Sequence, residues 1–80
     1  MSTATLELYR TESGSTYEVV GRQIRRANAD ASGLLGSWTP YERINRLPAA
    51  LFHPGSQGEI LEIVLTTGRR IYTSRLLTPW

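Results

Sequence analysis

Cysteine is absent from this sequence, and its absence removes two common ways of stabilising a small fold. Without thiols the chain forms no disulfide and no thiolate metal site. A domain of 80 residues also buries only about 60–65% of the surface that its unfolded chain exposes. Its stability must therefore come from packing alone, or from association with a second copy.

Long apolar runs and targeting signals are missing as well. No stretch approaches the roughly 20 apolar residues that a membrane span needs. Residues 1–10 contain no basic region followed by an apolar one, as a signal peptide would. We therefore expect a soluble protein in the cytoplasm, within the host cell in the case of a phage protein, and the length predicts a single domain over residues 1–80.

Lysine is the third absence, because all nine basic residues are arginine. Against seven acidic residues they leave a net charge of only +2, and neither half of the chain is a basic block. Two explanations stay open. Arginine binds carboxylate and phosphate in a planar, bidentate geometry that lysine reproduces poorly. Arginine-only usage also follows from codon preference in a GC-rich genome, which points to a high-GC bacterium or its phage.

Residues suited to catalysis are scarce. A Ser-His-Asp triad would have to use His53 and Asp30, the only histidine and the only aspartate, and the sequence has no Gly-x-Ser-x-Gly turn. His53 lies between Phe52 and Pro54, which favours a role in a turn or in packing. The glycines occur singly at turns and form no phosphate-binding loop. We predict a non-enzymatic protein with no metal and no cofactor.

Alternation of apolar and polar residues predicts two β-hairpins, one near each end of the chain. The four strands are expected at residues 3–10, 16–20, 59–67 and 69–77. In the second of them, Tyr17 and Val19 would face the core. The third has apolar residues on both faces, which indicates a central strand.

A third, shorter strand is expected after the first hairpin, at residues 23–27 (QIRRA). Ile24 and Arg26 would share one face of it. One apolar residue among polar ones is typical of a half-exposed or edge strand, where arginine also blocks aggregation. Beyond it, Leu34 and Leu35 are expected to fill the end of the core.

The middle of the chain carries a helix signal. Thr39, Pro40 and Glu42 fit a capping box, which predicts a short helix over residues 40–47. A strand over residues 38–44 is the competing interpretation. The predicted fold is mainly β: a small five-stranded antiparallel sheet or an SH3-like barrel, with one short helix.

Protein binding is the function that the residue types favour most, because arginine, tyrosine and tryptophan are enriched at the centres of interfaces. The expected contact residues are clustered arginines and two aromatic residues of the middle segment: Arg22, Arg25, Arg26, Arg69, Arg70, Trp38 and Tyr41. Trp80 either closes the end of the barrel or is an exposed anchor. Pairing of an edge strand with a second copy would give a homodimer.

Nucleic-acid binding is the alternative. A small barrel binds single strands of RNA or DNA by charge and by stacking of bases on aromatic rings, and Tyr72 and Arg75 add to the groups available for this. The small net charge argues against it, because several phosphate contacts are needed at cellular salt.

Three short stretches resemble small uncharacterised proteins of phages and high-GC bacteria: residues 13–19 (SGSTYEV), Trp38 with Tyr41-Glu42, and Thr66-Thr67-Gly68 with Thr73-Ser74. In size, single-domain build and lack of enzymatic motifs the chain is also similar, as a class, to phage anti-CRISPR inhibitors. That likeness implies an inhibitor that occludes a host protein or ribonucleoprotein complex, with arginines pairing with carboxylates of the target. A structural subunit of a phage particle is the third interpretation.

Overall fold

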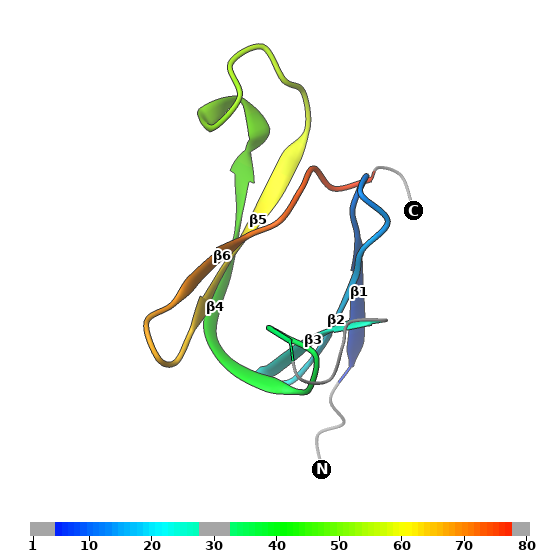
Figure 1. Ribbon diagram of the computed structural model, residues 1–80, viewed down its shortest axis with the longest axis vertical. Helices are drawn as coiled ribbons and strands as arrows, with labels where there is room; N and C mark the ends of the chain where they lie inside the picture. Colours follow the sequence, from blue (N-terminus) through cyan, green and yellow to red (C-terminus); the bar gives the residue numbers. More distant parts are fainter. Residues whose placement is uncertain (1–4, 28–32, 78–80) are drawn as a thin grey trace.

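The protein folds into one antiparallel sheet of six strands, which a computed structural model describes for residues 5–27 and 33–77. The strands follow one another across the sheet in chain order, so each pairs with its sequence neighbour (Figure 1). The elements are β1 (Leu6–Arg10), β2 (Thr16–Val20), β3 (Gln23–Ala27), β4 (Thr39–Pro48), the 3₁₀ turn η1 (Ala49–Leu51), β5 (Glu59–Leu65) and β6 (Arg70–Tyr72). Within the described residues there is no α-helix.

The N-terminal half confirms the strands expected there. β1 and β2 form a hairpin in which Tyr9 pairs with Tyr17, and Tyr17 and Val19 are buried as predicted. Gly21, at a φ of 57°, then turns the chain directly into β3. β3 is not an edge strand, because it pairs with β2 along its length and with β4 at Gln23 and Ile24. The pairing with β4 ends at Ile24, so Arg25 and Arg26 lie beyond it, and the Arg26 N–H donates to the Leu35 carbonyl at 2.7 Å.

The predicted helix over residues 40–47 is wrong, because this segment is the strand β4. The capping box does not form: the Thr39 hydroxyl donates a hydrogen bond to the Ser37 carbonyl instead. A helix of two turns is marginal in water, whereas β4 pairs with β5 from Tyr41 to Pro48 and so satisfies its backbone groups. The competing interpretation, a strand from Trp38 onward, had the right type of element but ended too early.

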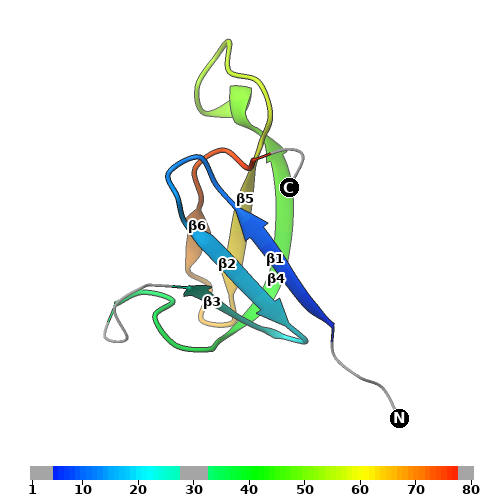
Figure 2. The ribbon, with the colours of Figure 1, turned by 90° about the vertical axis from the view of Figure 1, so that its right-hand side faces the viewer.

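β4 holds the two halves of the sheet together. Its first residues pair with β3, and the rest pairs with β5. The register with β5 shifts between Tyr41 and Arg43, and such a bulge bends a strand. As a result the β1–β3 half and the β4–β6 half face each other, with β1 and β2 lying in front of β4 and β5 in Figure 2.

The sheet stays open, so the SH3-like barrel is not formed and the strand count is six rather than five. β6 ends at Tyr72, well before the end of the predicted strand 69–77. The segment after β6 approaches the end of β1 at a single β-bridge, between Leu76 and Thr11, the residue that follows β1. Beside this bridge the Leu77 N–H donates to the Arg10 carbonyl at 2.9 Å. β6 has only three residues, which is too short to pair along β1 and complete a barrel.

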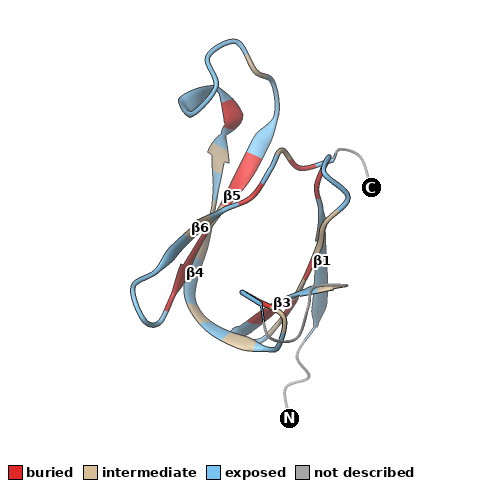
Figure 3. Ribbon diagram, viewed as in Figure 1, coloured by how far each residue is buried: buried red, intermediate tan, exposed pale blue. Residues whose placement is uncertain are grey.

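Both halves of the sheet contribute to the core, and Figure 3 shows buried segments in each of them. Its buried members are Tyr17, Val19, Ile24, Leu35, Leu61, Ile63, Leu65 and Leu76. β5 supplies three of these eight residues, more than any other strand, and it lies between β4 and β6, which confirms the predicted central strand. Of the two leucines expected to fill the end of the core, Leu35 does so and Leu34 is exposed.

We expect Leu61→Ala to lower the free energy of unfolding by about 2–5 kcal/mol, because it empties a fully buried site in a small core. Urea denaturation followed by tryptophan fluorescence measures this loss. Leu51→Ala is the control with the same chemistry, since Leu51 is 67% exposed. Equal losses in the two variants would contradict the assignment of the core.

Candidate functional site

The outer face of the β1–β3 half is the first candidate, and the strand register defines it. Residues directly opposite one another in neighbouring strands lie on the same face of a sheet. Leu6 is opposite Val20, and Leu8 is opposite Glu18, which is opposite Arg25. Tyr17, Val19 and Ile24, on the other face, are buried in the core, so this row faces outward.

Large apolar side chains are exposed on this outer face. Leu6 is 51% exposed, Leu8 41%, and Trp38, whose ring packs against Arg25, 37%. Half-buried Val20 completes the apolar part. We call the set Leu6, Leu8, Val20, Arg25 and Trp38 the outer patch.

Arg25 is held in place within the outer patch. Its Nε donates a hydrogen bond of 2.7 Å to Glu18 Oε1, and its Cζ lies 4.6 Å from the centroid of the Trp38 ring. A cation over an aromatic face is attracted by the negative charge of the ring. These two contacts fix the orientation of both Arg25 and Trp38, although each remains partly exposed.

The β2–β3 turn brings two more of the predicted contact residues close to the outer patch. Arg22 is exposed and its Nη1 donates to the Glu42 carbonyl at 2.9 Å. The Tyr41 hydroxyl donates to the Gly21 carbonyl at 2.9 Å, and its ring packs against the core. Tyr41 therefore stabilises the turn from its core side. Because its ring is partly buried, it is less suited than Trp38 to act as an anchor for a partner.

The remaining predicted arginines lie elsewhere. Arg26 is opposite Tyr17, which places it on the inner face, away from Arg25. Arg69 and Arg70 belong to the β5–β6 hairpin, at the left of Figure 1, whereas β3 is at the lower right. Arg70 Nη1 is 3.9 Å from Glu62 Oε2. The seven predicted contact residues thus do not form one surface: Arg22, Arg25, Trp38 and Tyr41 gather, and the other three do not join them.

Of the residues considered for catalysis, the structure describes only His53. His53 is exposed on the loop after η1, while Asp30 and Trp80 lie outside the described residues. Across residues 5–27 and 33–77, no group of three histidine, cysteine or acidic residues is arranged to hold a metal ion. The described residues likewise contain no helix long and apolar enough to span a membrane.

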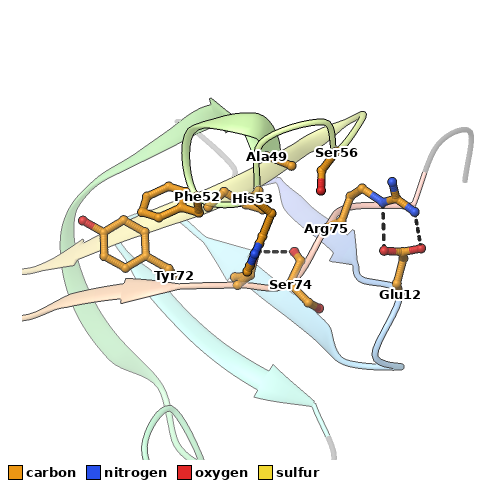
Figure 4. Close-up of a pocket in the computed structure, with 10 residues that line it drawn as sticks. Glu12, Ala49, Phe52, His53, Ser56, Tyr72, Ser74 and Arg75 are labelled. Atoms are coloured by element: carbon orange, nitrogen blue, oxygen red, sulfur yellow. Dashed lines mark hydrogen bonds and ion pairs between the residues drawn. The ribbon is translucent and has the colours of Figure 1, made fainter.

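A pocket of about 540 Å³ is the second candidate, and it lies between the loop after η1 and the segment after β6. Figure 4 shows Phe52 and Tyr72 at one side of it, His53 in its middle and the Arg75–Glu12 pair at the other side. In the sequence analysis, Tyr72 and Arg75 are named only among the groups available for nucleic-acid binding. Nothing in the spacing along the chain indicates that the loop would fold over them.

The Arg75–Glu12 pair links the two ends of the sheet. Arg75 donates from Nε and Nη2 to the two carboxylate oxygens of Glu12, at 2.8 and 2.5 Å, and from Nη1 to the Gln57 carbonyl at 3.2 Å. The hydrogen bonds from Arg75 lower the pKa of the Glu12 carboxyl below its usual value. The aliphatic part of Arg75 crosses Gly58 so closely that a Cβ there would lie 2.9 Å from Arg75 Cδ.

With this fold and these sites described, the chain can be compared with known proteins as a small all-β protein built on an antiparallel meander. No protein-family model matches it, and no curated protein or solved structure is significantly similar to it. What the protein does must therefore be inferred from its own residues.

We expect Glu12→Gln to reduce stability at neutral pH and to have little effect in acid. Because the pKa of Glu12 is lowered in the folded protein, its stabilisation is complete above the ordinary value of 4.5 and is lost as pH falls through the folded pKa. Denaturation curves of the wild type and the variant, measured from neutral pH downward, should therefore converge in acid. A constant difference at every pH would show that the ion pair is not responsible.

We expect Gly58→Ala to destabilise the protein more than Gly14→Ala, its matched control. Both glycines have positive φ, +85° and +90°, so alanine costs about 1–2 kcal/mol of backbone strain at either site. Only at Gly58 does the new Cβ also displace Arg75, since Gly14 has open space around it. Gly58→Ala should therefore also weaken the acid dependence that Glu12 gives to stability. Equal effects of the two variants in denaturation curves would contradict this geometry.

Proposed function

We propose that this protein is a non-enzymatic binding protein and that its outer patch docks onto an acidic surface of a partner protein. The observation that carries the proposal is the exposure of Leu6, Leu8 and Trp38 on one face. A chain of 80 residues without disulfides gains stability from every large apolar side chain it buries. Several such side chains left exposed on one face, in a domain this small, are typical of an interaction site.

The charges around the outer patch favour a partner with carboxylates. Arg10 lies on the same face as Leu6 and Leu8, and Arg22 is exposed at the adjoining turn. Together with Arg25 they outnumber Glu18, the acidic residue of the central row. Trp38 and Arg25 are residue types enriched at interface hot spots. Because they already contact each other in the free protein, they lose less side-chain conformational entropy when a partner binds.

The concrete form of the proposal is an inhibitor from a phage or mobile element that occludes a surface of a host complex. It is supported by the class likeness to phage inhibitors and by a surface that offers binding groups in preference to catalytic ones. A protein partner is favoured over RNA or DNA because three arginines outside the outer patch are already paired with acids: Arg46 with Glu59, Arg70 with Glu62 and Arg75 with Glu12. The arginines are also spread over different faces, where they cannot follow one phosphate backbone.

Site-specific photocrosslinking tests this function. The photoreactive residue p-benzoylphenylalanine is placed at position 8 in the outer patch or, as a control, at the exposed position 51, and each protein is irradiated in a lysate of its natural host. We expect position 8, and not position 51, to give a discrete protein adduct. Excess unlabelled wild-type protein should compete for it, and Leu8→Ser should compete about tenfold less well, as loss of a central interface residue predicts.

The other outcomes each contradict the proposal. A nuclease-sensitive adduct would indicate RNA or DNA as the partner, and an adduct of twice the chain mass would indicate a homodimer. Equal adducts at both positions, or none at position 8, would mean that the outer patch is not a docking surface.

A further inference from the structure

We propose that the pocket under the loop after η1 is a second binding site, and that it takes a small ligand in which a planar aromatic ring carries a single carboxylate. This site is independent of the docking function proposed for the outer patch. Its volume, about 540 Å³, is within the range of roughly 300–1,000 Å³ typical of small-molecule pockets.

One side of the pocket provides a platform for a planar ring. Phe52 and Tyr72 contact each other with their ring centroids 5.0 Å apart and tilted by 52°. Each is 45% exposed, although Phe52 is the only phenylalanine of the chain and would stabilise the core if buried. The Tyr72 hydroxyl donates to Glu62 Oε2 at 2.8 Å, which orients the ring before any ligand arrives. A planar ligand ring packing here would cover both exposed aromatic surfaces.

The opposite side of the pocket provides donors for an anionic group. A guanidinium has five N–H groups. Arg75 uses three of them on Glu12 and Gln57, which leaves one on Nη1 and one on Nη2. Those same three bonds, and the close passage over Gly58, hold the guanidinium in position. Figure 4 shows that His53 and Ser56 lie between Arg75 and the aromatic side, where Ser56 adds a hydroxyl. The Ser74 hydroxyl is already hydrogen-bonded to Ser13 Oγ at 2.8 Å.

Glu12 selects the charge of the ligand. Its carboxylate offsets the charge of Arg75 in the same pocket, and the described residues that line the pocket include no second arginine, so nothing there would offset the second charge of a phosphate. A carboxylate brings a single charge, and its two oxygens match the two remaining N–H groups of Arg75 in number. The aromatic side then fixes the rest of the molecule, so that ring and carboxylate together span the pocket from Tyr72 to Arg75.

A titration of the ¹⁵N-labelled full-length protein, followed by amide chemical shifts, tests the site. The probes are indole-3-acetate, its neutral analogue indole-3-acetamide, acetate alone, and adenosine monophosphate as the aromatic dianion. We expect indole-3-acetate to shift the amides of Phe52, Tyr72, Ser74 and Arg75 in a saturable way. The acetamide and the dianion should bind at least about tenfold more weakly, because one lacks the charge and the other is repelled.

Two variants assign the two sides of the pocket. Phe52→Ala should weaken indole-3-acetate binding about tenfold, as loss of one stacking ring predicts, while Leu51→Ala on the neighbouring exposed residue should not change it. Arg75→Lys keeps the positive charge but loses the planar guanidinium and its paired N–H donors, so it should also weaken indole-3-acetate binding. If that variant does not fold, Phe52→Ala and the acetamide comparison decide the question.

Three results would overturn the proposal. They are the absence of saturable shifts, equal affinity for indole-3-acetate and the acetamide, and shifts centred on Leu8, Arg25 and Trp38. The last result would move the ligand to the outer patch. Failure of this titration would leave crosslinking at position 8 unaffected, so the two sites are tested separately.

Discussion

One strand, β4, makes a single core out of an open sheet. It pairs with β3 at Thr39 and Pro40 and with β5 from Tyr41 onward, and the bulge between Tyr41 and Arg43 lets it turn between the two. A flat meander of this length would leave both faces of its strands in water. Because β4 bends, the apolar faces of the β1–β3 and β4–β6 halves meet, and residues such as Ile24 and Ile63 become fully buried.

The far ends of the bent sheet meet at a second, smaller junction. The bridge between Thr11 and Leu76 is short, and the Glu12–Arg75 pair strengthens it from outside. Arg75 also reaches Gln57 in the loop after η1, so one side chain ties together three segments that are distant in sequence. The same arrangement creates the pocket, because the loop must stand over the segment after β6 for Arg75 to contact both. Stability and the proposed ligand site therefore depend on the same residue.

The two candidate sites use different parts of the fold. The outer patch is a sheet surface whose exposed residues are fixed by strand register and by the Arg25–Trp38 contact. The pocket is formed by connecting segments, at the end of the molecule where η1 lies in Figure 1. A flat surface suits a macromolecular partner, and a concave pocket suits a small one. The arrangement would let a small ligand and a protein partner bind at the same time.

The local features of the fold could be predicted from the amino-acid sequence. Alternation located β1, β2, β3 and β5, assigned Tyr17 and Val19 to the core, and identified β5 as central, because side-chain period and burial are properties of a strand and its immediate neighbours. Residues 39–48 form a strand because pairing with β5 outweighs the helix cap that Thr39 and Glu42 suggest. Packing between distant segments likewise places Arg25 and Arg26 on opposite faces, turns Leu6 and Leu8 outward, and brings Arg75 into contact with Glu12. These outcomes depend on contacts between residues far apart along the chain, and composition and spacing carry no information about such contacts.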